Sequence, residues 1–172
     1  MEQFDVYDIN RVKTGVIKDK GTPLKDGEFR QVIHICIFNS KGEMLIQQRQ
    51  SFKKAWPNLW DITLGGCGIA GETSSQTAQR ELFEELGIML DFTKIRPHLT
   101  INFENGFDDY YFINLDLDAE KLKLQQEEVQ AARWATKQDV QNLIDQNKFI
   151  PYVPSFVLSL FDLKKMYGVI YK

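Results

Sequence analysis

The sequence has few of the residues that build cross-linked or linker-rich proteins. Its 172 residues include only two cysteines, Cys36 and Cys67, which is too few for a disulfide framework. There are five prolines, and no Pro- or Ser-rich stretch, internal repeat or low-complexity segment separates one part of the chain from another. We therefore expect a single domain over residues 1–172, with a core large enough to fold unaided.

An excess of one charge and a long apolar run are also missing. With 21 basic and 24 acidic residues the net charge is −3, which gives no support to binding of a nucleic-acid polymer or an anionic membrane. No apolar stretch approaches the length of a membrane span. The first residues, MEQFDVYDINRV, carry acids where a signal peptide has a basic and then an apolar run. These absences favour a cytoplasmic protein without a membrane partner.

What the chain does contain is many short strand patterns and a few dispersed helix patterns. Strands are expected at 4–12, 16–17, 31–39, 44–49, 62–64, 95–104, 109–117 and 129–134, the first two forming a hairpin over about 4–20. Helices are expected from Thr73–Ser75 to Gly87, over 136–147 with Thr136 as N-cap, and over 156–167 between Ser155 and Gly168. This order predicts an α+β fold with a mixed sheet between helices.

The stretch 66–88, GCGIAGETSSQTAQRELFEELGI, organises the chain. A glycine-rich loop, 65–68, leads into the first helix, where Ala78, Leu82 and Leu86 mark a buried stripe. Glu81, Glu84 and Glu85 lie on neighbouring turns, so their carboxylates can converge on one patch.

This acidic patch is at the unfavourable end of the helix. Glu84 and Glu85 occupy the last turn, where each acid costs roughly 0.3–1 kcal/mol against the helix dipole. A bound divalent cation would reverse the sign of that interaction. The helix alone leaves an ordinary solvated acidic face as an equal alternative.

Two other features have both a functional and a structural explanation. The segment 51–59 and the residue that follows it combine Lys53 with Trp56 and Trp60, which suits a phosphorylated ligand but equally suits aromatic cover for the core. His34 lies inside the strand 31–39, and we interpret it as a structural residue rather than a ligand.

The stretch 66–88 resembles the complete signature of the Nudix hydrolases. The matching positions are Gly66, Glu72, Arg80, Glu81, Leu82, Glu84, Glu85, Gly87 and Ile88. The resemblance implies a Nudix-type α/β/α sandwich and a Mg²⁺-dependent enzyme, for which Mn²⁺ is a substitute. It also implies hydrolysis of a diphosphate bond in a nucleoside diphosphate derivative or a similar small phosphorylated compound. A homodimer is compatible with the sequence.

The resemblance also assigns roles to residues. Glu84 and Glu85 would be the main metal ligands, Glu81 a ligand or the base that orients the attacking water, and Arg80 the residue that positions Glu81. Glu72 would support the geometry of the loop and helix or the metal shell. An acid outside the signature is expected to join them, and Asp108, Asp109, Glu127 and Glu128 are candidates, with Glu128 taken into the expected metal set. The expected substrate-binding residues are Gly65, Gly66, Lys53, Trp56, Trp60, Phe107 and Tyr110.

Looser similarities place the chain near the branch that contains isopentenyl-diphosphate isomerase. They fall on FNSKGEMLIQQR, KKAWPNLWDITLGG, FDDYYF, LQQEEV and Trp134. However, Gly65 stands where that enzyme has its catalytic cysteine, and Cys67 and Arg30 stand where it has two metal-binding histidines. Hydrolysis is therefore the expected chemistry. An isomerase-like enzyme and a catalytically silent ligand-sensing domain are the alternatives.

Overall fold

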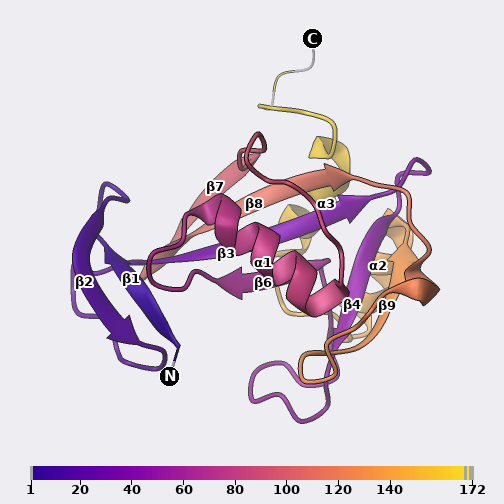
Figure 1. Ribbon diagram of the computed structural model, residues 1–172. Helices are drawn as coiled ribbons and strands as arrows, with labels where there is room; N and C mark the ends of the chain where they lie inside the picture. Colours follow the sequence, from indigo (N-terminus) through magenta and orange to yellow (C-terminus); the bar gives the residue numbers. More distant parts are fainter. Residues whose placement is uncertain (1, 169, 171–172) are drawn as a thin grey trace.

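The centre of the molecule is a mixed β-sheet. The computed structural model describes residues 2–168 and 170, and within them seven strands join this sheet (Figure 1). They are β3 (Arg30–Phe38), β4 (Met44–Arg49), β5 (Trp60–Asp61), β6 (Leu64–Cys67), β7 (Leu99–Phe103), β8 (Gly106–Asn114) and β9 (Val129–Ala135). Strand β3 runs parallel to β8 over its whole length, whereas the other pairings in the sheet are antiparallel.

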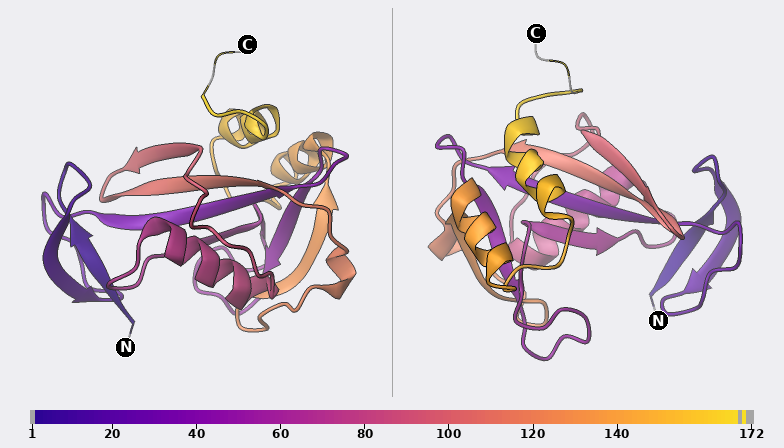
Figure 2. Two further views of the ribbon diagram at one scale, coloured as in Figure 1. Left: turned by 45° about the horizontal axis from the view of Figure 1, so that its top comes forward. Right: turned by 180° about the vertical axis from the view of Figure 1, so that it is seen from behind.

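Helices cover both faces of the sheet. Ile33, Ile35 and Ile37 of β3 pack on one face with α1 (Ser74–Leu86), while Cys36 and Phe38 pack on the other with α2 (Lys137–Asp145) and α3 (Pro154–Leu163). The two views of Figure 2 show α1 on one side of the sheet and α2 and α3 on the other. The alternation along β3 follows from the two-residue period of a strand, and the predicted α+β sandwich is confirmed.

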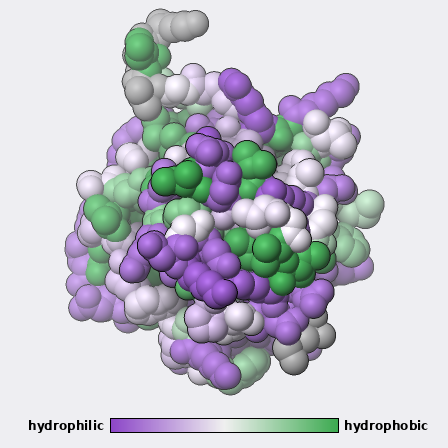
Figure 3. Space-filling view, turned by 90° about the vertical axis from the view of Figure 1, so that its left-hand side faces the viewer, coloured by the Kyte–Doolittle hydropathy of each residue, from purple (hydrophilic) through white to green (hydrophobic). Residues whose placement is uncertain are grey.

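The N-terminal hairpin forms a small sheet of its own. Strands β1 (Gln3–Tyr7) and β2 (Lys13–Asp19) pair with each other, and Tyr7 joins the hairpin to Phe29 through a pair of backbone hydrogen bonds. On this side of the molecule, apolar patches alternate with hydrophilic ones (Figure 3). The hairpin's exposed apolar side chains are Ile9, Val12, Val16 and Ile17.

Strands β3 and β4 touch only near their connecting turn and then diverge. Their pairing is limited to Phe38 and Met44, and β6 takes the place of β4 beside the first half of β3. The buried Thr63 hydroxyl bridges the gap, because it accepts from the Ile37 N–H at 2.8 Å and donates to the Leu45 carbonyl at 2.6 Å. This divergence opens the space in which the functional side chains lie.

The first two predicted helices form where their caps indicated. Thr73 and Gln76 make a capping box at the start of α1, and Gly87 ends it with a φ of 68°. Thr136 makes a second capping box with Asp139 at the start of α2. Within the described residues, no helix is both long and apolar enough to span a bilayer.

Three predicted boundaries need correction. Gly65 and Gly66, expected in a loop, belong to strand β6, whereas Gly68 follows the strand, and residues 62–63, expected in a strand, form a bend. The first strand ends at Tyr7, because the Asp8 carboxylate accepts from the Asn10 and Val12 N–H groups and turns the chain.

The last helix also differs from expectation. It starts at Pro154, whose fixed φ suits the first helical position, and Ser155 makes no cap. It ends at Leu163 rather than Tyr167. The chain leaves the helix there and Tyr167 stacks on His98, with ring centroids 4.0 Å apart.

Candidate functional site

Helix α1 presents an acidic face because its other face is anchored in the core. Ala78, Leu82 and Leu86 are almost fully buried against the sheet. This fixes the rotation of the helix and directs Glu81 and Glu85 toward β6 and β4, while Glu84 stays partly exposed.

The three glutamates border a cavity of about 230 Å³, which we call the carboxylate cavity. Eight of the residues expected from the sequence line it, namely Lys53, Gly65, Gly66, Arg80, Glu81, Glu84, Glu85 and Glu128. They come from the loop after β4, from β6, from α1 and from the segment before β9. Lys53 and Glu128, which are 75 positions apart in the chain, therefore meet in one site.

Arg80 holds the acidic residues in a fixed arrangement. Its Nε and Nη2 donate to Glu72 at 2.8 and 3.0 Å, and its Nη1 donates to Glu81 at 2.9 Å and to Glu84 at 3.0 Å. Burial opposes ionisation of Glu72, but the hydrogen bonds from Arg80 and Thr77 outweigh it and lower the pKa of this carboxyl. Glu72 thus contacts Arg80 beside the cavity, and it does not line the cavity as the expected metal set would require.

Gly66 leaves the room that the Glu81 carboxylate occupies. A Cβ atom at position 66 would overlap the Glu81 side chain, and one at Gly65 would lie 2.7 Å from His34 Nδ1. Both glycines pair with β3 in register, Gly66 opposite Ile33 and Gly65 opposite His34. The glycines therefore serve close packing of side chains on a strand, not the freedom of a loop.

Glu85 is the most deeply buried acid of the site. It is 6% exposed, and its Oε2 accepts from Gln47 Nε2 at 3.1 Å. Burial, followed by the charge of Glu81, raises its pKa to about 8, and burial also raises the pKa of Glu81. Both carboxyls are thus held where their negative charge is poorly compensated.

Glu128 is the acid outside the signature that reaches the cavity. Its carboxylate contacts Lys53 Nζ at 2.6 Å. Asp108 faces His34 at 3.3 Å, and Asp109 accepts from Gln31, Ser74 and Thr100. Asp108, Asp109 and Glu127 do not line the cavity.

The four aromatic residues expected around the substrate do not line the carboxylate cavity. Tyr110 and Phe107 are buried, and Tyr110 stacks on His34 with ring centroids 4.6 Å apart. Trp60 packs against the core beneath Arg133, and Trp56 is about half exposed on the loop before β5. His34 thus lies between Tyr110 and Asp108 of strand β8, and its role as a structural residue stays a prediction.

Several residues of the site were not identified from the sequence. Glu2, Lys20, Arg49 and Gln125 line the cavity, and Gln47 supports Glu85 from β4. Their positions depend on how the hairpin and β4 fold back onto α1, for which no short motif exists. Only the polar Gln47 and Gln48 at the end of an otherwise apolar strand gave a local signal.

The donor set fits a hard divalent cation. Carboxylate oxygens are the ligands that Mg²⁺ prefers, and Glu81, Glu84, Glu85 and Glu128 supply them around one cavity. In the described part of the chain, however, no three acidic, histidine or cysteine side chains are already gathered as a metal-binding group. Arg80 lies between Glu81 and Glu84, and Lys53 pairs with Glu128, so these two cations compensate the acids here.

Comparison with known proteins identifies the family. The NUDIX domain model matches residues 28–154. An uncharacterised Nudix hydrolase of Listeria monocytogenes is 48% identical over 95% of this chain and 96% of its own length. An isopentenyl-diphosphate Delta-isomerase of Pectobacterium atrosepticum is 33% identical over 60% of this chain and 56% of its own length.

A solved structure agrees with the fold. The crystal structure of the Deinococcus radiodurans protein DR0079 superposes with a TM-score of 0.75 at 20% identity, covering 96% of this chain and 100% of that one. The matched domain model, the Listeria relative and the acidic helix beside β6 agree. The chain belongs to the Nudix hydrolase family.

Proposed function

We propose that the chain is a Mg²⁺-dependent pyrophosphohydrolase of small phosphorylated compounds, with nucleoside diphosphate derivatives as the first class to test. The observation that supports this most is the convergence of Glu81, Glu84, Glu85 and Glu128 on one cavity that also contains Arg49 and Lys53. A diphosphate substrate needs acidic side chains that hold a cation and basic side chains that bind its phosphate oxygens.

Each residue has a distinct role in the proposed reaction. Glu84, Glu85 and Glu128 would hold the cation, with Glu81 as a further ligand or as the base. The bound cation supplies neutralisation of charge on the phosphoryl oxygens and a more acidic water. Arg49 and Lys53 would bind and orient the diphosphate.

Glu81 is suited to take the proton. Its pKa is raised by burial, and Arg80 holds one of its oxygens at 2.9 Å. Water oxygen attacks phosphorus, the bridging P–O bond breaks, and the proton of the water passes to the Glu81 carboxylate. Two phosphorylated products leave.

The test is a substrate screen with matched variants. Purified protein with Mg²⁺ is incubated with nucleoside diphosphate derivatives, and product release is measured. We expect hydrolysis that chelation abolishes, a loss of at least about a hundredfold for Glu84→Gln and Glu85→Gln, and a smaller loss for Glu128→Gln. Glu127→Gln is the control, because this neighbouring acid is exposed and lies outside the cavity.

Other outcomes separate the alternatives. Full activity in both Glu84→Gln and Glu85→Gln would refute the assigned roles. Tight binding without turnover of any compound would favour a ligand sensor. Isomerisation of isopentenyl diphosphate would favour the isomerase, against the position of Gly65, which offers no thiol.

A further inference from the structure

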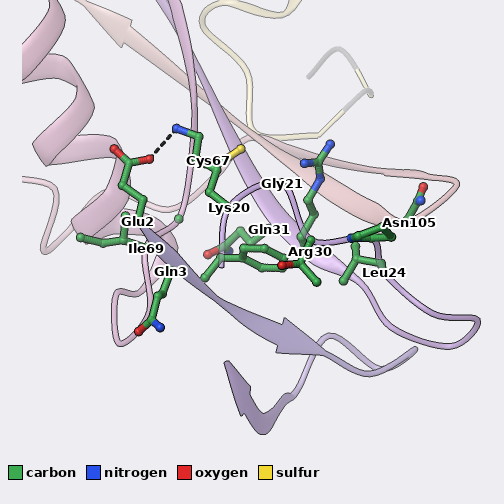
Figure 4. A pocket seen from close by; sticks show the side chains of 14 residues that line it. Glu2, Gln3, Lys20, Gly21, Leu24, Arg30, Gln31, Cys67, Ile69 and Asn105 are labelled. Atoms are coloured by element: carbon green, nitrogen blue, oxygen red, sulfur yellow. Dashed lines mark hydrogen bonds and ion pairs between the residues drawn. The ribbon is translucent and has the colours of Figure 1, made fainter. Parts of the chain in front are cut away.

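A second cavity adjoins the carboxylate cavity on the side of the hairpin. This side cavity, of about 240 Å³, lies between β1, the segment 20–24 that follows β2, the start of β3 and the end of β6 (Figure 4). The two cavities share Glu2, Lys20, Cys67 and Ile69. A ligand with its diphosphate near the glutamates can therefore extend its remaining part beneath the hairpin.

The walls of the side cavity are mainly neutral. Phe4, Pro23, Leu24 and Ile69 supply apolar surface, and three amide side chains, Gln3, Gln31 and Asn105, supply polar groups. Its volume is below that of a complete pocket for a drug-sized ligand, so it suits one ring of a larger compound. Apolar walls with a few amides are typical of sites for flat heterocycles.

Arg30 provides a cation that no carboxylate of the described residues compensates. It lies at the start of β3, with its guanidinium 5.9 Å from the Phe103 ring. Among the described residues its guanidinium makes no ion pair or hydrogen bond, and it lines the side cavity. Lys20, by contrast, pairs with the Glu2 carboxylate (Figure 4).

The charges around the side cavity favour a neutral ring over a second phosphate as its ligand. A second phosphate would meet only one uncompensated cation and would face the Glu2 carboxylate on the same wall. A neutral ring avoids that repulsion and still uses Arg30, because a guanidinium donates two hydrogen bonds to adjacent acceptors on a base edge. Guanine presents such a pair, whereas adenine presents an amino donor beside its ring nitrogen.

We propose that the side cavity binds the base of a nucleoside diphosphate derivative and that Arg30 selects bases with a carbonyl acceptor, guanine first. This inference rests on the proposed function and specifies its substrate class. The base would lie under the hairpin while its diphosphate reaches the carboxylate cavity.

The experiment compares GDP-glucose, UDP-glucose and ADP-glucose, which differ only in the base. We expect kcat/KM for GDP-glucose to exceed that for ADP-glucose by about tenfold or more, with UDP-glucose between them. Arg30→Ala should remove this preference by raising KM for GDP-glucose with little change in kcat. Arg96→Ala is the matched control, because Arg96 is also exposed and lies over an aromatic ring, that of Tyr167, away from both cavities.

A second variant tests the cavity without changing charge. Leu24→Trp places a larger side chain on its wall and should weaken all base binding while Mg²⁺ binding is retained. An equal loss of kcat/KM on all three substrates in Arg30→Ala would show that Arg30 binds a phosphate. An unchanged preference for GDP-glucose would show that Arg30 does not contact the base. Either result overturns the proposal.

Failure of the proposed function would be visible separately. If the wild-type protein hydrolyses none of these compounds, titration calorimetry with guanosine and adenosine, without metal, still tests the cavity. Guanosine binding that is lost in Arg30→Ala supports the proposed base site. Absence of guanosine binding to the wild-type protein overturns the proposal.

Discussion

At the scale of single residues, Gly66 shows how the site depends on an absent side chain. The Glu81 carboxylate lies in the space that a Cβ at position 66 would occupy. Because β6 pairs with β3 on both sides of Gly66, the backbone has little freedom to withdraw. The flexible Glu81 side chain must move instead.

Gly66→Ala is therefore expected to impair activity more than stability. A displacement of about 1 Å at a catalytic group costs about a hundredfold in rate. The melting temperature should change little, because the displaced group is the end of a side chain. Steady-state kinetics and thermal unfolding measure the two effects, and a variant with full activity would contradict the role of Gly66.

Glu85 predicts a pH dependence of stability in the metal-free protein. In the unfolded chain this carboxyl ionises near its ordinary pKa of 4.5, whereas in the folded chain its pKa is about 8. The unfolded state thus binds fewer protons between these pH values. The contribution of protonated Glu85 to the free energy of unfolding is therefore full below pH 4.5 and is lost as the pH rises through 8.

Thermal unfolding in a chelator between pH 5 and 8.5 checks this expectation. The melting temperature of the wild type should fall by several degrees more than that of Glu85→Gln, which retains an acceptor for Gln47. Parallel curves for the two proteins would mean that Glu85 titrates normally.

The sequence predicted the part of the site that lies on one helix, and missed what other elements bring to it. Glu81, Glu84 and Glu85 follow from helical spacing, and Arg80 from the family signature. Tyr110 and Phe107 were expected at the substrate, yet a strand pattern does not show which face of the strand meets a ligand. Lys20 and Arg49 carry no local signal, because only tertiary folding places them at the cavity.

At the scale of elements, α1 and α2 offer a matched comparison. Both begin with a threonine that completes a capping box, but only α1 carries acids that line the carboxylate cavity. The boundaries of these helices were predictable because caps are local chemistry. Strand β6 was not predictable, because glycines favour loops by propensity and only the pairing with β3 stabilises them as a strand.

Thr73→Ala and Thr136→Ala should lower stability to a similar extent. Loss of an N-cap costs about 1 kcal/mol, or about 2–4 °C in melting temperature for a domain of this size. Only Thr73→Ala should also weaken Mg²⁺ binding, measured by calorimetry, because it loosens the helix that holds Glu81, Glu84 and Glu85. Equal effects of both variants on Mg²⁺ binding would contradict this assignment.

At the scale of the whole molecule, the hairpin and the central sheet should differ in local stability. Strand β3 is paired on both sides and buried between helices, whereas β2 pairs with no described strand except β1, and β1 is joined to the rest of the chain mainly through Tyr7 and Phe29. A two-stranded sheet is marginal unless other elements support it.

Hydrogen exchange followed by mass spectrometry or NMR measures this difference. Amides of β3 and β8 should exchange at rates set by global unfolding, and amides of β2 much faster, through local opening. A β2 as protected as β3 would indicate that the hairpin is an integral part of the core.

The parallel pairing of β3 with β8 has a consequence for how the chain is made. Arg30 pairs with Gly106 and Phe38 with Asn114. Strand β3 therefore cannot pair with β8 until some 76 further residues have been synthesised. Closing so long a loop is entropically costly, and contacts of this separation slow folding. On a ribosome adding about 5–20 residues per second, β3 would spend several seconds without that partner. We expect this edge of β3, with its apolar side chains, to be a site where the nascent chain is prone to aggregate.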